Sequence, residues 1–322
     1  MSGWRLDNRY QLKILESPEE INAVEELERL VWPGSETEVV PAHMLLAVIH
    51  NGGLIIGAYD VGAQAATSAE LDTPAEISAE APLVGFVFGF PGLYYTPDGP
   101  SLKHHSHMMG VHPDFRNQGI GFALKRAQWQ MVRHQGLDRI TWTYDPLLSR
   151  NAYLNIARLG TVCNTYLKDF YGELRDGLNV GVATDRFQVD WWVLSQRVFR
   201  RLSKWARPRL ELAQFLDAGV PILNPTRMDA DGLPRLPSRA AMQDMQARLD
   251  SPNRDAILLV EIPSDFTALK SVSLDLAHEW RMYARELFED LFARGYLVTD
   301  FVYLPGAAPR SFYVLSHGES TL

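Results

Sequence analysis

Hydrophobic and polar positions along the first two hundred residues predict a mixed α/β structure. Residues Tyr10–Leu15 alternate between apolar and polar side chains, which is typical of a half-buried strand. The motif Ser17-Pro18-Glu19-Glu20 predicts a helix start, because Ser17 suits the N-cap, Pro18 the first helical position and Glu20 the capping box. Further strands are expected at Gly53–Tyr59, Leu83–Phe90, Ser101–Val111, Asp138–Tyr144, Val162–Tyr166 and Phe187–Leu194, and helices at Ile120–Gln135 and Ser149–Leu159. This order predicts an α/β arrangement in which Val61–Ala81 forms a long hairpin insertion.

The pattern changes after Arg200, and the chain is expected to have three parts. Residues 1–200 form the first domain, residues 201–240 an irregular, proline-containing linker, and residues 241–322 a smaller C-terminal α/β unit. That unit is expected to hold a strand at Ala256–Ile262, a long helix at Leu274–Arg294 and a hairpin around Pro305-Gly306. The apolar face of the helix needs a partner surface, which either the first domain or a second copy in a homodimer would supply.

Composition and charge exclude several classes of protein. With 46% hydrophobic and 22% charged residues, the chain is unlike a disordered one, and its net charge of -8 argues against a nucleic-acid binder. The longest apolar run, Leu83–Phe90, is far shorter than the roughly 18 residues that a membrane helix needs, and no secretory signal is visible. The single cysteine, Cys163, excludes an internal disulfide and a Cys-rich metal site. We therefore expect a cytoplasmic protein without a metal, a nucleic-acid partner or a membrane partner.

The most informative stretch is the turn that joins the expected strand Ser101–Val111 to the helix after it. Glycines 119 and 121 stand where the helix begins. Backbone N–H groups at a helix start are unpaired and carry the positive end of the helix dipole, so they bind phosphate groups. Glycine lets the backbone approach a pyrophosphate without a Cβ in the way. Taken alone, two glycines are weak evidence, and an ordinary strand-to-helix turn explains them equally.

The motif Arg116-x-x-Gly119-x-Gly121, with Val111 ending the preceding strand, resembles the acyl-CoA signature of the GCN5-related N-acetyltransferase (GNAT) superfamily. The order of elements over roughly residues 1–200 is also similar to that fold. Within the superfamily, the segment Asp145–Asn155 and the helix end Leu159-Gly160 resemble an uncharacterised group of predicted acetyltransferases. The resemblance implies a GNAT fold with a mixed sheet and acetyl-CoA or CoA as co-substrate.

The resemblance also implies which residues hold the co-substrate. The amides of Gln118, Gly119, Ile120 and Gly121 would cradle the pyrophosphate, in the same turn as Arg116 and Asn117. The backbone groups of Met109 and Val111 would pair with the pantetheine arm where their strand separates from Ile140–Tyr144. Asn151 is a candidate for a further bond to that arm, or else an ordinary residue near a helix N-terminus.

Acyl transfer to an amine needs a neutral amine, a donor to the developing oxyanion and a proton for the leaving thiolate. By the same resemblance, the N–H of Met109 is the oxyanion donor, and His105 stands at the position of the family's glutamate base. Strand alternation puts His105 and His107 on one face and His104 on the other. His105 is the first candidate for the base and His107 the second, since an unperturbed imidazole titrates near pH 6.5. Purely structural roles and opportunistic metal binding stay open for all three.

The family's usual tyrosine acid is absent, because Ile156 occupies its position. Tyr153 and Tyr166 are candidate substitutes, although tyrosines in such positions are more often core or surface aromatics. The leading prediction is an acyl-CoA-dependent, and first of all acetyl-CoA-dependent, N-acyltransferase acting on a small-molecule or peptide amine. The alternatives are a non-catalytic acyl-CoA-binding or sensing protein of the same fold, and acyl transfer to a hydroxyl group. The sequence does not identify the acceptor or a role for the C-terminal unit.

Overall fold

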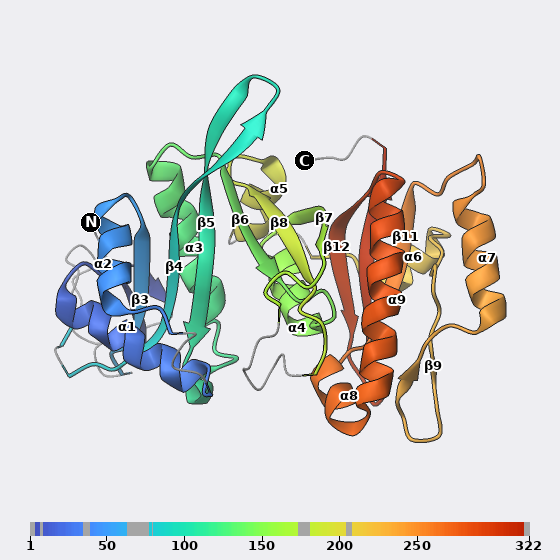
Figure 1. Cartoon of the computed structure of the whole chain (residues 1–322), viewed down its shortest axis with the longest axis horizontal. Helices are drawn as coiled ribbons and strands as arrows, with labels where there is room; N and C mark the ends of the chain where they lie inside the picture. The colour runs from blue at the N-terminus through green and yellow to red at the C-terminus, as the bar shows by residue number, and fades with distance from the viewer. Residues whose placement is uncertain are drawn as a thin grey trace. The chain divides into compact units, whose positions relative to one another are not determined.

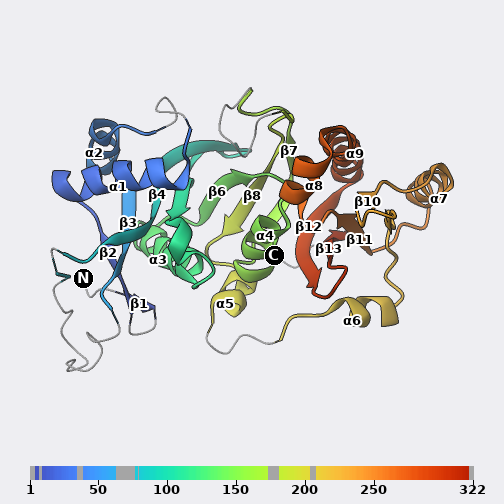
Figure 2. The ribbon, with the colours of Figure 1, turned by 90° about the horizontal axis from the view of Figure 1, so that it is seen from below.

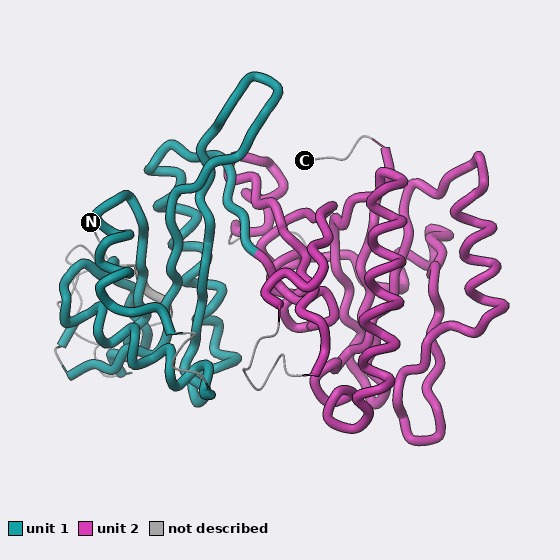
Figure 3. Tube along the Cα trace, in the orientation of Figure 1, with its two compact units in different colours: residues 1–142, 175–177 teal, residues 143–174, 178–322 magenta. Residues whose placement is uncertain are grey.

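The computed structural model describes residues 4–6, 9–34, 39–62, 77–78, 80–172, 181–203 and 208–318 (Figure 1). The chain divides into two compact units, shown in different colours in Figure 3. Unit 1 comprises residues 1–142 and 175–177, and unit 2 comprises residues 143–174 and 178–322. This division by packing falls inside a strand. It does not test the domain boundaries expected at residues 200 and 240, which stay predictions.

Unit 1 is built on a sheet whose strands follow the chain order from β1 to β6. The strands are β1 (Trp4–Leu6), β2 (Tyr10–Ile14), β3 (Leu54–Asp60), β4 (Leu83–Thr96), β5 (Gly99–Val111) and β6 (Arg139–Tyr144), of which β6 crosses the boundary between the units. Neighbours up to β5 pair antiparallel, and β5 pairs parallel with β6. The helical segments are α1 (Pro18–Val31), α2 (Ala42–His50), the short turn η3 (Pro113–Phe115) and α3 (Ile120–His134). The mixed α/β prediction is confirmed.

Helices cover both faces of this sheet, α1 and α2 on one face and α3 on the other (Figure 2). On the α3 face, Ile120, Leu124 and Met131 pack against side chains of β2, β3 and β4. On the opposite face, Ile21 and Val24 of α1 belong to a second apolar cluster. The sheet is therefore enclosed, and a side chain on β5 faces either α3 or the α1–α2 layer.

The start of α1 follows the sequence prediction. Ser17 Oγ accepts a hydrogen bond from Glu20 N at 3.3 Å, and Glu20 Oε2 accepts one from Ser17 N at 3.1 Å. The capping box is therefore complete. Helix α2 was not predicted, because its nine residues are too few for a clear periodic pattern. The hairpin expected at Val61–Ala81 falls largely on residues 63–76 and 79, outside the described residues.

Unit 2 has its own run of neighbouring strands in the order β8-β7-β12-β13-β11. These are β7 (Val162–Leu167), β8 (Arg186–Trp192), β11 (Ile257–Ile262), β12 (Tyr296–Leu304) and β13 (Arg310–His317). The helices are α4 (Ser149–Ala152), the π-helical turn η4 (Tyr153–Arg158), α5 (Gln196–Leu202), α6 (Leu212–Asp217), α7 (Arg239–Leu249), α8 (Phe266–Val272) and α9 (Leu274–Ala293), and a small separate hairpin joins β9 (Arg227–Met228) to β10 (Pro234–Arg235). Across the described residues, no helix has the length and apolarity needed to cross a bilayer.

The predicted elements of unit 2 are present, with additions. Strands β12 and β13 pair antiparallel on either side of Pro305-Gly306, as predicted. The predicted apolar face of α9 is buried, namely Trp280, Ala284, Leu287 and Leu291. Helices α5, α7 and α8 were not predicted, and the segment expected to be irregular holds α6 and the β9–β10 hairpin. Short helices are hard to predict from sequence, because tertiary packing stabilises them and they show too few turns for a clear periodic pattern.

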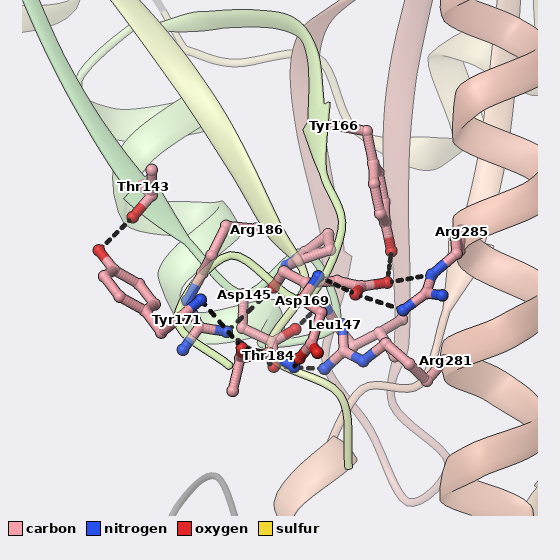
Figure 4. A network of polar contacts seen from close by, with 12 residues as sticks. Thr143, Asp145, Leu147, Tyr166, Asp169, Tyr171, Thr184, Arg186, Arg281 and Arg285 are labelled. Atoms are coloured by element: carbon pink, nitrogen blue, oxygen red, sulfur yellow. Dashed lines mark hydrogen bonds and ion pairs between the residues drawn. The ribbon is translucent and has the colours of Figure 1, made fainter. Parts of the chain in front are cut away.

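Two arginines of α9 join parts of unit 2 that are far apart in sequence. Arg281 and Arg285 project from the helix toward the segments that carry Asp145 and Tyr166 (Figure 4). Arg281 Nη2 lies 2.5 Å from Asp145 Oδ2, and Arg285 donates to both carboxylate oxygens of Asp185, at 2.9 and 2.6 Å. The segments that carry Asp145 and Asp185 are therefore joined to the C-terminal helix within one packed unit.

Candidate functional site

Strand β5 has an open edge over its last residues. It pairs with β6 through His104 with Ile140 and His105 with Thr141, and among the described residues the pairing goes no further. On the other side of β5, Phe88 of β4 pairs with Met108 and the next pair joins Gly89 to Ser106, so His107 is an extra residue in β5. Such a bulge bends a strand and increases its twist. We call the side of β5 from Ser106 to Val111 that does not pair with β6 the open edge. It begins next to His105, the last residue of β5 that pairs with β6, and we call this end the closed end.

Hydrogen bonding to β4 shows which backbone groups face this edge. His112 N donates to Val84 O at 2.9 Å, on the β4 side. Since antiparallel pairing alternates along a strand, the N–H groups of Met109 and Val111 point to the opposite side, toward the open edge. The carbonyl of Val111 accepts a hydrogen bond from Arg116 Nε at 3.3 Å. The two residues predicted to pair with a pantetheine arm therefore present N–H groups along a strand edge that lacks a partner strand.

The turn after β5 leads directly to the N-terminus of α3. Asn117 and Gly119 have φ angles of 66° and 83°, in the left-handed region that glycine and asparagine adopt most readily. Helix α3 begins at Ile120, and its first backbone hydrogen bond runs from Ala123 N to Gly119 O at 3.1 Å. The N–H groups of Gly119, Ile120 and Gly121 precede that bond and so lack an intrahelical acceptor.

Side chains leave the turn open toward a ligand. Arg116, Asn117 and Gln118 are exposed, and Gln118 is held by a hydrogen bond from the Tyr10 hydroxyl and by its own bond to Asp114 O at 3.4 Å. Gly121 lies against the flexible end of the Met109 side chain, since a Cβ added to it would be 3.3 Å from Met109 Cε. The start of α3 therefore packs beside β5. The turn and the edge fit the diphosphate and the extended arm of CoA.

His105 and His107 lie on the same face of β5, as alternation predicts. Their ring centroids are 5.9 Å apart, and Phe90 packs at 5.4 Å from the His105 ring and at 5.9 Å from the His107 ring. His104 points to the other face, where it is fully buried and its Nε2 lies 3.2 Å from Gln128 Nε2. The bulge at His107 changes the alternation after it, so that Met108 packs on the α1–α2 face and Met109 on the α3 face.

Both candidate bases are uncharged at neutral pH. Burial, helped by the nearby His107 and Lys103, lowers the pKa of His105 to about 4, although a hydrogen bond with the backbone of Thr141 acts in the opposite direction. His107 is exposed to solvent, but partial burial beside Phe88 lowers its pKa as well. Both pKa values therefore lie below the value near 6.5 that the sequence predicts for an ordinary imidazole. At pH 7 both rings can accept a proton, but they are weaker bases than a free histidine.

Sequence reasoning missed a polar cluster on the α3 face of β5. It contains Lys125 and Gln128 of α3 together with Ser106 and His104 of β5, and all four side chains are buried. We call these four residues the amine cluster. Lys125 Nζ donates to Ser106 Oγ at 2.7 Å and lies 3.7 Å from the centre of the Trp142 ring, and Ser106 Oγ donates to Gln128 Oε1 at 2.9 Å. A signal was present, because Lys125 and Gln128 are three positions apart and therefore share one side of the helix, beside its apolar stripe.

The remaining candidates belong to unit 2. Asn151 is half-buried in α4, and no hydrogen bond of its side chain occurs within the described part of the chain. The Tyr153 hydroxyl accepts a hydrogen bond from the Arg209 guanidinium, and the Tyr166 hydroxyl donates to Asp185 Oδ2 at 2.8 Å. Unit 1 thus brings together His105, His107 and all the predicted backbone groups, whereas Asn151 and Tyr153 are placed in the other unit.

The described residues offer no candidate group for metal chemistry and no reactive thiol. Within the ranges that the structure describes, no three His, Cys, Asp or Glu side chains are grouped as the ligands of a metal ion would be. Cys163 is fully buried, and burial raises the pKa of its thiol well above the usual range. A buried thiol with a raised pKa is unreactive and fills space in the core.

Comparison with known proteins confirms the resemblance. Residues 62–154 match the model of the acetyltransferase (GNAT) family, a segment that runs through β4, β5, α3, β6 and α4. The matched segment includes the open edge, the turn and the amine cluster. No curated protein is detectably similar to this chain in sequence.

Solved structures with partial likeness are also acetyltransferases by name. Ribosomal-protein-S5-alanine acetyltransferase from Vibrio fischeri is 15% identical, covers 65% of this chain and 100% of its own, and has a TM-score of 0.41. Ribosomal-protein-S18-alanine N-acetyltransferase from Escherichia coli is 13% identical, with coverages of 57% and 94% and a TM-score of 0.38. The NatC complex bound to Gag peptide and CoA is 14% identical, with coverages of 57% and 98% and a TM-score of 0.40. We infer no function from likenesses this partial.

Proposed function

We propose that this protein is an acyl-CoA-dependent N-acyltransferase that transfers an acyl group to the amine of a small molecule or peptide. The observation that carries the proposal is the junction of two features in unit 1. The helix start at Gly119–Gly121 offers N–H groups to a diphosphate, and the open edge at Met109 and Val111 offers strand-like hydrogen bonds to the arm that follows it. The family match over residues 62–154 supports the same reading. Acetyl-CoA is the donor that the resemblance implies.

The donor would supply a thioester carbonyl activated toward attack by an amine. The backbone of β5 acts on that carbonyl through Met109, whose N–H is directed to the open edge and would donate to the developing oxyanion. The fixed dipole of a strand backbone needs no rearrangement as charge develops. The same N–H would therefore both orient the thioester and stabilise the transition state.

Proton transfer is assigned to the histidines. An acceptor amine arriving on the α1–α2 face would meet His105 and His107, both neutral at pH 7. A neutral imidazole can take a proton from the attacking amine directly or through a water molecule. Tyr153 is the proposed proton donor to the leaving thiolate, although its hydroxyl contacts Arg209.

A second candidate function is acyl-CoA binding or sensing without turnover. Two observations favour it, namely the low basicity of His105 and the replacement of the usual acid tyrosine by Ile156. Release of CoA in the presence of a panel of amines separates the two functions. If His105 is the base, His105→Ala should slow that release about 100-fold or more without changing CoA affinity.

Calorimetric titration of CoA tests the binding site itself. Gly119→Asp places a carboxylate at the helix start and should abolish binding. The matched control is Gly136→Asp, at the other end of α3, where the φ angle of 75° imposes the same backbone strain and no atom lies near the added Cβ. Binding by wild type and the control but not by Gly119→Asp would support the proposal. If folded wild-type protein binds neither CoA nor acetyl-CoA, the proposal is wrong.

We further propose an acidic, cytoplasmic enzyme that works without a metal and without nucleic-acid or membrane partners. The net charge of -8 and the single, buried cysteine support this setting. The acceptor amine and a homodimer formed through the C-terminal unit stay open proposals, to be addressed by amine screening and by the mass of the protein in solution.

A further inference from the structure

The amine cluster contains a buried cation without an anion. The Lys125 side chain is only 3% exposed, and its Nζ contacts Ser106 Oγ at 2.7 Å, Gln128 Oε1 at 3.4 Å and the Trp142 ring at 3.7 Å. None of the ion pairs formed among the described residues includes Lys125. All three contacts are with neutral groups that accept hydrogen bonds or offer a π face.

This arrangement is costly for the protein alone. An ammonium group removed from water without a counter-ion is unfavourable, and a methionine of similar length would fill the same space without that cost. Burial lowers the pKa of Lys125 to about 7, so the amine is close to losing its proton under ordinary conditions. The titratable groups coupled to Lys125 are His104, on the same face, and His105. Both are bases, so neither supplies a negative charge.

The position of the cluster suggests where an anion would come from. Ser106 and Trp142 are the residues that directly follow the last pairs of β5 and β6, His105 with Thr141 being the final one. Lys125 therefore lies at the closed end of the open edge. A donor with its diphosphate at Gly119–Gly121 and its arm along Val111 and Met109 extends its acyl group toward that closed end. This step rests on the proposed function.

We propose that Lys125 recognises a carboxylate at the far end of the donor's acyl group, and that the preferred donor is the CoA thioester of a short dicarboxylic acid. The carboxylate supplies the anion that the amine cluster lacks. Ser106 Oγ adds a hydroxyl that can turn its donor from Gln128 to the ligand. A charged pair with an ammonium in a site shielded from water is strong, so this contact discriminates between acyl groups.

Calorimetry with matched thioesters tests the proposal. Succinyl-CoA and butyryl-CoA share a four-carbon acyl chain and differ in the terminal carboxylate. Wild-type protein should bind succinyl-CoA about tenfold or more tightly than butyryl-CoA or acetyl-CoA. Binding of succinyl-CoA, but not of the other two, should take up a proton above pH 7, because the new anion favours the charged amine. Titration in two buffers of different ionisation enthalpy measures that uptake.

Two variants give the test its control. Lys125→Met keeps the length of the side chain and should abolish both the tenfold preference and the proton uptake, while the affinity for CoA itself stays unchanged. Lys125→Gln serves the same purpose should the methionine variant fold poorly. Equal affinity of wild type for the three thioesters, or a preference that survives both substitutions, overturns the inference and leaves the proposed function standing. If no CoA compound binds to folded protein, the proposed function fails and this inference with it.

Discussion

The two units of this protein bury cations in different ways. In unit 2, Arg281 and Arg285 each meet a carboxylate, Asp145 at 2.5 Å and Asp185 at 2.6 Å. In unit 1, Lys125 is about as deeply enclosed as Arg281, but its amine contacts a hydroxyl, an amide and an indole ring. A buried pair is strongly destabilised when one partner is removed, whereas an unpaired buried cation is unfavourable from the start. Removing a carboxylate of unit 2 should therefore lower the free energy of unfolding, whereas replacing Lys125 in unit 1 by an apolar residue should raise it.

The charges of Arg281 and Arg285 have a structural role, whereas the charge of Lys125 is free to change. Arg281 and Arg285 join α9 to segments one hundred or more residues earlier in the chain, and their charges are committed to that task. The Lys125 amine holds no such segment by an ion pair. Its charge can change with pH or with a ligand, which is typical of groups in functional sites.

The largest effect is expected from breaking a pair in unit 2. Asp185→Asn should lower the free energy of unfolding by about 3–5 kcal/mol at pH 7, because it removes a fully buried carboxylate that Arg285, Tyr166 and the backbone of Asp169 all bind. Burial opposes ionisation of Asp185, but hydrogen bonds from Arg285, Asp169 N and Tyr166 outweigh it and lower its pKa. The stabilisation is thus present above about pH 4 and is lost as pH falls through the lowered pKa. Urea denaturation of wild type and variant at pH 7 and pH 3 measures the loss of unfolding free energy and its dependence on pH. A loss below about 1 kcal/mol at pH 7 would contradict the account.

The second prediction has the opposite sign. Lys125→Met should raise the free energy of unfolding at pH 7 by about 1–4 kcal/mol, as replacement of buried charge by apolar side chains often does. The lysine pKa is about 7 in the folded protein against 10.5 for the ordinary side chain. Between these values the unfolded chain binds more protons, so wild-type stability should rise with pH from 7 to about 10. The unfolding free energy of Lys125→Met should rise less steeply with pH than that of wild type. A variant that is destabilised and keeps the wild-type pH dependence would contradict this prediction.

The smallest effect is expected for a pair on the surface of unit 2. Asp255→Asn removes the partner of Arg248, 2.8 Å away, at a site where the two side chains are 30% and 47% exposed. Such pairs contribute about 0.2–1 kcal/mol, and salt screens them. The same chemical substitution as at Asp185 should therefore cost several-fold less. A cost similar to that of Asp185→Asn would mean that burial is not what makes the pairs of α9 strong.

Local signals in the sequence predicted much of unit 1. The capping box at Ser17, the glycines of the turn and the alternation of His105 and His107 depend on neighbouring residues, and each is present as predicted. The bulge at His107 was not predicted, because it depends on pairing with β4 and leaves no mark in the local pattern.

Features set by distant contacts were beyond the sequence. The pair of Asp145 with Arg281 joins residues 136 positions apart, and no periodicity identifies it. Lys125 could have been noticed in its helical stripe, but a lysine in an amphipathic helix is usually solvated, so its burial follows only from the packing of α3 on β5. The candidate donors Tyr153 and Asn151 stay predictions for the same reason, since their roles depend on the arrangement of the two units.

Hydrogen–deuterium exchange with and without CoA tests the central claim most directly, namely that the turn and the open edge of β5 hold the co-substrate. Saturating CoA should slow exchange in peptides that cover Ser106–Phe122, because the N–H groups of Met109, Val111 and Gly119–Gly121 gain acceptors. The hairpin of β12 and β13 should exchange at an unchanged rate. Protection confined to other parts of the chain, or no protection anywhere at saturating CoA, would contradict the account.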